Sequence, residues 1–126
     1  RACGADFAYA GSVFIATEEC RASPAYKQAI VEGRANDIVY SSLFTGVHGN
    51  YLRGSIIAAG LDPDNLPEGT ISSMDFGSGG SSDAKAWRDI WGSGQGIGAV
   101  DKVASVAELV ARLKREYDAA RAALCA

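Results

Sequence analysis

This sequence has little metal-ligating chemistry. It contains one histidine, His48, and three cysteines, Cys3, Cys20 and Cys125, among 126 residues. Because no CxxC pair and no Cys/His pairing is present, we do not expect a metal site. The odd number and wide spacing of the cysteines argue against a disulfide framework. The pattern predicts free thiols in a reducing, cytoplasmic compartment.

Long apolar runs and an excess of basic residues are also missing. No apolar run reaches the roughly 18 residues that a membrane span requires. The net charge of −3 and the pI near 5.0 provide no basic field for nucleic acid. We therefore expect neither a membrane nor a nucleic-acid partner. The apolar fraction of 48% with 21% charged residues is ordinary for a globular domain.

The start of the chain has the composition of a buried strand. The apolar positions in this stretch are Phe7, Ala8, Tyr9, Ala10, Val13, Phe14 and Ile15. A strand of a parallel sheet is apolar on both faces, so we predict a strand over residues 6–11. At its end, Gly11 permits close approach of the backbone to a ligand, and Ser12 with the adjacent amides can hold an anion such as phosphate. The alternative is that Gly11 and Ser12 form a tight helix entry.

Such a strand needs parallel neighbours, and no other stretch of this sequence has the same composition. Unpaired edges leave backbone hydrogen bonds unsatisfied and promote association. The chain also begins at Arg1, directly before the strand, without an initiator Met or a signal-peptide apolar region. We therefore expect the C-terminal end of a larger α/β protein.

Helix signals follow in the rest of the chain. Ser23 before a proline predicts a helix over residues 25–32 that stops at a glycine. An apolar helix is expected over residues 51–59, ending at Gly60, and a short one over residues 83–91.

The connections between these helices are rich in glycine or proline. Residues 45–50 and 92–98 are predicted turns, and residues 62–67 a rigid loop. Residues 76–82 have the composition of a linker or surface lid. Residues 38–40 are either a short strand or a buried connection.

The last helix has the strongest signal. Ser105 and Glu108 form a capping box. Apolar residues recur at helical spacing: Val106, Leu109, Val110, Leu113, Tyr117, Ala120 and Leu124. The charges of Arg112, Lys114 and Arg115 are expected on the solvated face.

In order along the chain, these segments resemble the C-terminal portion of the nitronate monooxygenase (2-nitropropane dioxygenase-like) family. The matching stretches are residues 4–19, 25–30, 37–40, 43–53, 59–67, 76–80, 86–98 and 106–110. The blocks His-Gly-Asn-Tyr-Leu from His48 and Trp-Gly-Ser-Gly-Gln-Gly from Trp91 are the most specific. Members of this family are flavin-dependent (β/α)8-barrel enzymes related to a flavin-containing enoyl-ACP reductase.

The resemblance implies an α/β fold, namely an FMN-binding TIM barrel. This helix-rich chain would form the C-terminal part of that barrel. Residues 1–16 then hold the last barrel strand and the phosphate loop. Residues 17–104 form a helical and loop region that covers the barrel mouth, and residues 105–126 form the C-terminal helix.

FMN is the cofactor that the resemblance implies. Tyr9, Ala10, Gly11 and Ser12 correspond to the segment that binds its phosphate through backbone amides and a hydroxyl, where barrel enzymes often bind phosphate. Relatives often have Thr at the position of Ser12, so the hydroxyl is kept. They commonly have Arg at the position of Val13, and that arginine is missing here.

Other candidate site residues lie further along the chain. Gln95 and its neighbouring amides are expected to approach the flavin or close the barrel mouth, with a plain turn as the alternative. His48, Asn50, Tyr51 and Arg53 are candidates for a substrate pocket, in which the arginine attracts an anionic nitronate. The alternative is a capped helix start with a solvent-facing histidine.

No catalytic residue is assigned in this chain. The family's catalytic histidine is expected upstream of Arg1, and His48 does not match its motif. Trp87 and Trp91 are expected to pack rather than to stack on flavin. The acidic residues of 62–68 are expected to form a solvated loop rather than a calcium site.

The expected function of the intact protein is the FMN-dependent oxidation of alkyl nitronates with O2. An alternative is a flavin-dependent enoyl reductase-like enzyme. A second alternative is a non-catalytic fragment or subunit that associates with the missing N-terminal part, with another chain, or with its own copies.

Overall fold

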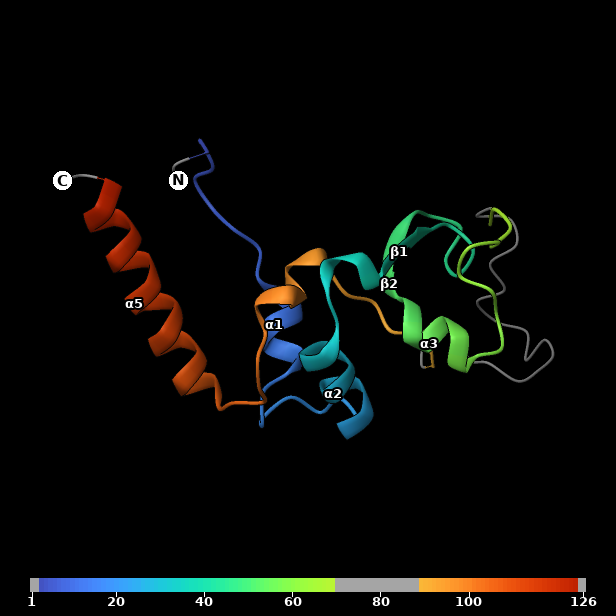
Figure 1. The fold of residues 1–126 in the computed structure, drawn as a ribbon, viewed down its shortest axis with the longest axis horizontal. Coiled ribbons are helices and arrows are strands. Elements are labelled where there is room, and N and C mark those ends of the chain that lie inside the picture. The colour runs from blue at the N-terminus through green and yellow to red at the C-terminus, as the bar shows by residue number, and fades with distance from the viewer. Residues whose placement is uncertain (1–2, 70–88, 125–126) are drawn as a thin grey trace.

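The computed structural model describes residues 3–69 and 89–124 (Figure 1). Its elements in chain order are α1 (Gly11–Ile15), α2 (Pro24–Glu32), the 3₁₀ helix η1 (Ala35–Asp37), β1 (Ile38–Ser41), β2 (Gly49–Leu52), α3 (Arg53–Ala58), the 3₁₀ helix η3 (Gln95–Ala99) and α5 (Val106–Leu124). The described part of the chain is therefore a mixed α/β structure with one two-stranded antiparallel sheet. The linker predicted over residues 76–82 lies outside the described residues, as do Trp87 and Cys125. Of the helix predicted over residues 83–91, the structure describes residues 89–91.

A small core holds the central elements together. Its buried members are Ile30 of α2, Leu52 of β2 and Ile97 of η3. Ala16, directly after α1, and Val100, directly after η3, complete it. Figure 1 shows α1, α2 and η3 gathered at the centre of the molecule. The close packing depends on glycine after α2, since a Cβ at Gly33 would lie 2.7 Å from Cδ1 of Ile97.

The helix predicted over residues 25–32 is confirmed as α2. The Ser23 hydroxyl accepts a hydrogen bond from the Tyr26 amide at 3.2 Å, and Pro24 occupies the first helical position. A side-chain acceptor at the N-cap satisfies one of the free amides of the first turn. The local sequence signals that predict this helix are therefore present in the structure.

The stretch 38–40 is a strand rather than a connection. β1 and β2 pair in an antiparallel register that places Ile38 opposite Leu52 and Ser41 opposite Gly49. The predicted helix over residues 51–59 is wrong at its start, because residues 51 and 52 pair with β1 and α3 begins only at Arg53. α3 ends at Ala58, one residue before the predicted end, and Gly60 follows at φ 79°.

The predicted strand over residues 6–11 is wrong for this structure. Between residues 3 and 37 the structure has no strand, and α1 starts at Gly11. Phe7 and Tyr9 are 91% and 106% exposed. A strand is stabilised by backbone hydrogen bonds to a neighbouring strand, whereas the described strands, β1 and β2, pair with each other. The helix-entry alternative for Gly11 and Ser12 is therefore the observed one.

The C-terminal helix is confirmed together with its capping box. The Ser105 amide donates to the Glu108 carboxylate at 3.3 Å, and the Glu108 amide donates to the Ser105 hydroxyl at 3.2 Å. The carboxylate of Glu19 accepts a further hydrogen bond from the Val106 amide at 3.0 Å. An acidic group at this end of a helix is favourable for the helix dipole.

The apolar face predicted for α5 is mostly uncovered. Leu109 is buried, but Tyr117 is 49% and Leu124 is 68% exposed. Figure 1 shows why, since α5 runs away from the central elements after its first turns. No helix in residues 3–69 and 89–124 is long and apolar enough to cross a membrane.

Ile97 gives a direct test of the core. Replacement by Ala should lower the free energy of unfolding by about 2–5 kcal/mol, because the side chain is fully buried. Ile57, which is 57% exposed on α3, provides a matched control. Its replacement by Ala should change stability by no more than about 0.5 kcal/mol. Urea denaturation of both variants measures the difference, and equal losses would contradict the described core.

Candidate functional site

The four residues predicted to bind phosphate line one cavity. This cavity has a volume of about 340 Å³. Its lining residues are Tyr9, Ala10, Gly11, Ser12, Val13, Gly94, Gly96, Ala99, Val100, Arg112, Leu113 and Glu116. The two glycine-containing segments that the sequence singled out separately therefore meet, although they lie far apart in the chain.

One hydrogen bond joins these segments. The Gly94 amide donates to the Ser12 hydroxyl oxygen at 2.9 Å. A hydroxyl can accept a hydrogen bond and still donate its own proton. Ser12 therefore keeps one donor for an anion in the cavity. A Cβ at Gly11 or at Gly96 would meet no atom within 4 Å, so the backbone at both positions borders open space.

Arg112 brings a positive charge to this cavity. The prediction that it lies on the solvated face of the last helix is wrong, because its side chain is only 27% exposed. Its Nη1 donates to Asp101 at 3.0 Å, and its Nε lies 3.6 Å from a carboxylate oxygen of Glu116. This Nε is buried without a hydrogen-bond partner. Position 112 follows the buried Leu109 by three, so helical spacing could have identified it.

Gln95 does not line the cavity, although its neighbours Gly94 and Gly96 do. It is exposed at the first position of η3. A role for its side chain near a flavin stays a prediction.

The substrate-pocket candidates are not gathered in one place. His48 stacks on Tyr40 with ring centroids 4.7 Å apart. It lines a separate, more polar cavity of about 290 Å³, together with Asp64 and Glu68. Of the four candidates, only His48 lines that cavity.

The charge of Arg53 is already compensated. Its Nη1 and Nη2 each donate to a carboxylate oxygen of Asp64 at 2.8 Å. The hydrogen bond to Asp64 raises the pKa of Arg53, and the same bond lowers the pKa of Asp64. Both Nη groups of Arg53 are therefore bonded to Asp64, and a role for the guanidinium with an anionic nitronate stays a prediction.

The other two candidates contribute to local structure. The Tyr51 ring packs edge-on against Phe44 at 4.8 Å, and its hydroxyl lies 3.3 Å from that of Thr45. The carbonyl of Asn50 accepts from the Ser93 amide at 3.0 Å. β2 is thereby bonded to the segment that leads into Gly94.

Trp91 packs as predicted. It stacks on Tyr26 with ring centroids 5.0 Å apart, and the Tyr26 hydroxyl donates to the carbonyl of Gly92. Burial, followed by the charge of Cys20, raises the pKa of Tyr26. Cys3 and Cys20 are free thiols, as predicted. In the described part of the chain, no group of three histidine, cysteine or acidic residues could hold a metal ion.

The contact between the two cavity segments can be tested through one hydroxyl. Ser12→Ala removes the acceptor for the Gly94 amide, so hydrogen exchange at that amide should accelerate about tenfold, the equivalent of roughly 1.4 kcal/mol for one lost bond. Ser12→Thr keeps the hydroxyl and should retain most of the protection. Unchanged exchange in Ser12→Ala would contradict the bond.

Comparison with known proteins finds no matching family model, no matching curated protein and no matching solved structure.

Proposed function

We propose that this chain is part of an FMN-dependent oxidoreductase that oxidises alkyl nitronates with O2. The observation that carries the proposal is the hydrogen bond between Ser12 and Gly94, which brings the segment resembling the family's phosphate loop against a second glycine-rich segment. The substrate class rests on the resemblance alone.

The cavity residues suit the phosphate end of FMN. Ser12 offers a hydroxyl proton, the backbone at Gly11 and Gly96 is open, and Arg112 offers a guanidinium. A volume of about 340 Å³ lies at the lower end of small-molecule sites. The cavity would therefore hold the phosphate and adjoining ribityl chain rather than the whole cofactor.

The charged groups around this cavity are one cation, Arg112, and two carboxylates. Arg112 is compensated by Asp101 and by Glu116, which also lines the cavity. A phosphate monoester carries about −1.5 to −2 charges at neutral pH. Glu116 therefore opposes binding of the phosphate, and Arg112 favours it.

Bound FMN would supply the redox chemistry of the proposed reaction. The residues of this chain would bind and orient the phosphate end, and no general base is assigned among them. The apolar side chains of Val13 and Val100 would shield that end from water.

Flavin fluorescence tests the phosphate site. The chain should bind FMN more tightly than riboflavin, because riboflavin lacks the phosphate. Ser12→Ala should weaken FMN binding about tenfold, the equivalent of one charge-assisted hydrogen bond, and leave riboflavin binding unchanged. Glu116→Gln should strengthen FMN binding, because it removes a repulsive charge.

Ser12→Thr is the matched control, since it retains the hydroxyl. Equal affinity for FMN and riboflavin would contradict the phosphate site. In protein loaded with FMN, oxygen consumption with propane-2-nitronate supports nitronate oxidation. Reduction of an enoyl thioester without nitronate activity would assign the enoyl reductase-like alternative instead.

A second candidate function is association with another chain. The exposure of Phe7 and Tyr9 favours it, because these rings lie in a segment with no paired strand. A measured mass well above 13.1 kDa without flavin binding would support this alternative over the enzyme.

A further inference from the structure

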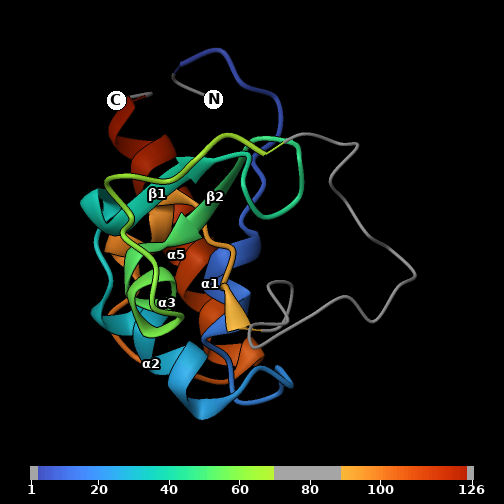
Figure 2. The ribbon, with the colours of Figure 1, turned by 90° about the vertical axis from the view of Figure 1, so that its right-hand side faces the viewer.

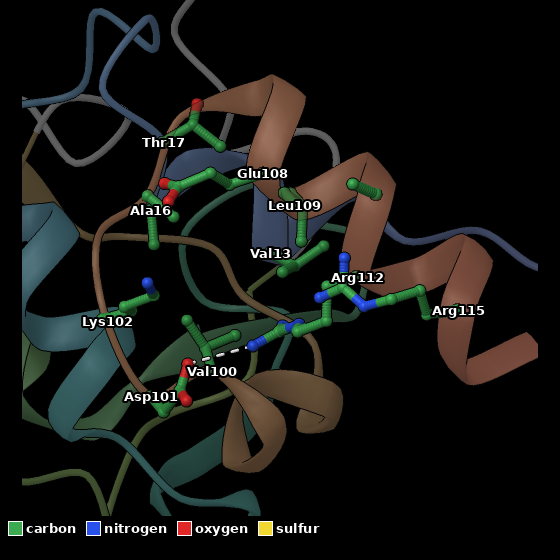
Figure 3. A pocket seen from close by; sticks show the side chains of 12 residues that line it. Val13, Ala16, Thr17, Val100, Asp101, Lys102, Glu108, Leu109, Arg112 and Arg115 are labelled. Carbon is green, nitrogen blue, oxygen red and sulfur yellow. Dashed lines mark hydrogen bonds and ion pairs between the residues drawn. The ribbon is translucent and has the colours of Figure 1, made fainter.

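We propose that a second cavity, beside the first, binds a small carboxylate that carries a short alkyl chain. Figure 3 shows this cavity between α1, the segment 100–104 and the first turns of α5. Its volume is about 260 Å³. The residues that line it are Val13, Ala16, Thr17, Val100, Asp101, Lys102, Ala104, Glu108, Leu109, Ala111, Arg112 and Arg115.

The cavity combines an apolar wall with three cations. Val13, Val100 and Leu109 are among the apolar residues that form the wall. Figure 3 shows Arg112 and Arg115 reaching from α5, and Lys102 on the segment across from them. An alkyl chain would gain from contact with the wall, and a carboxylate would gain from the guanidinium groups.

The lining of the cavity carries three cations and two carboxylates, those of Asp101 and Glu108. Arg112 is paired with Asp101 and also with Glu116, which does not line this cavity, and the Glu108 carboxylate accepts from the Ser105 amide. Neither Lys102 nor Arg115 forms an ion pair with another residue in the described ranges. Lys102 and Arg115 are therefore the cations left for the carboxylate of a ligand.

The size and lining select the ligand class. Small-molecule sites usually have volumes of about 300–1,000 Å³, so this cavity suits a ligand with only a few carbon atoms. Inorganic phosphate would use the cations but not the apolar wall. A carboxylate with a short alkyl chain uses both.

This site adjoins the proposed FMN site and shares Arg112 with it. The two cavities share Val13, Val100 and Arg112, whereas Ser12 and Gly94 line only the FMN cavity. Arg115 and Lys102 line only the second one. Substitution of Ser12 therefore tests the FMN site, and substitution of Arg115 or Lys102 tests the second site.

The test is an NMR titration of the ¹⁵N-labelled 126-residue chain with acetate, butyrate and hexanoate. Affinity should rise with alkyl length, and the shifts should concentrate in the amides of residues 13–17 and 100–104. Arg115→Gln should weaken hexanoate binding about three- to fivefold, as expected for loss of one partly exposed ionic contact. Lys102→Gln should weaken it in the same direction.

Lys114→Gln is the matched control, because Lys114 pairs with Asp118 and does not line the cavity. It should bind hexanoate like the unaltered chain. Equal weakening by Arg115→Gln and Lys114→Gln would show that only net charge matters and would overturn the site. Affinity that does not rise from acetate to hexanoate, or shifts that lie elsewhere, would also overturn it.

Discussion

The structure depends on the attachment of residues 12–18 to residues 94–104. At one end the Gly94 amide bonds to Ser12, and at the other Ala104 exchanges backbone hydrogen bonds with residues 16 and 18 at 3.3 and 3.0 Å. Between these points Ile97 and Val100 enter the core. The same attachment fixes the start of α5, the helix coloured orange to red in Figure 2. Arg112 on this helix lines both cavities. Without this attachment, residues 94–104 would not face residues 12–18, and each cavity would lose the residues that line one of its sides.

Elements with local signals were predictable from the sequence. The Ser23 cap of α2 and the capping box of α5 are formed by residues within one helical turn of each other. Elements that depend on distant partners were not. Residues 51 and 52 read as part of a helix but pair with β1, and residues 6–11 have the composition of a strand but no strand partner in the described ranges. Apolar composition alone does not distinguish these outcomes, because hydrogen-bond partners decide them.

The candidate site was predictable in part for the same reason. Glycine and serine marked the two segments that line the first cavity, but their meeting is a tertiary contact. Arg112 was missed because its charge indicated a solvated face, whereas its spacing from Leu109 places it beside the core. The role expected for Arg53 depended on a free guanidinium, and Asp64 compensates it from eleven residues further along the chain.

The most direct measurement is an NMR titration of the ¹⁵N-labelled chain with FMN. The largest shifts should fall at the amides of residues 11–12 and 94–96, which border the first cavity, with little change at residues 48–53. The largest shifts at residues 48–53, or none at either glycine-containing segment, would contradict the assignment of that cavity to the phosphate of FMN.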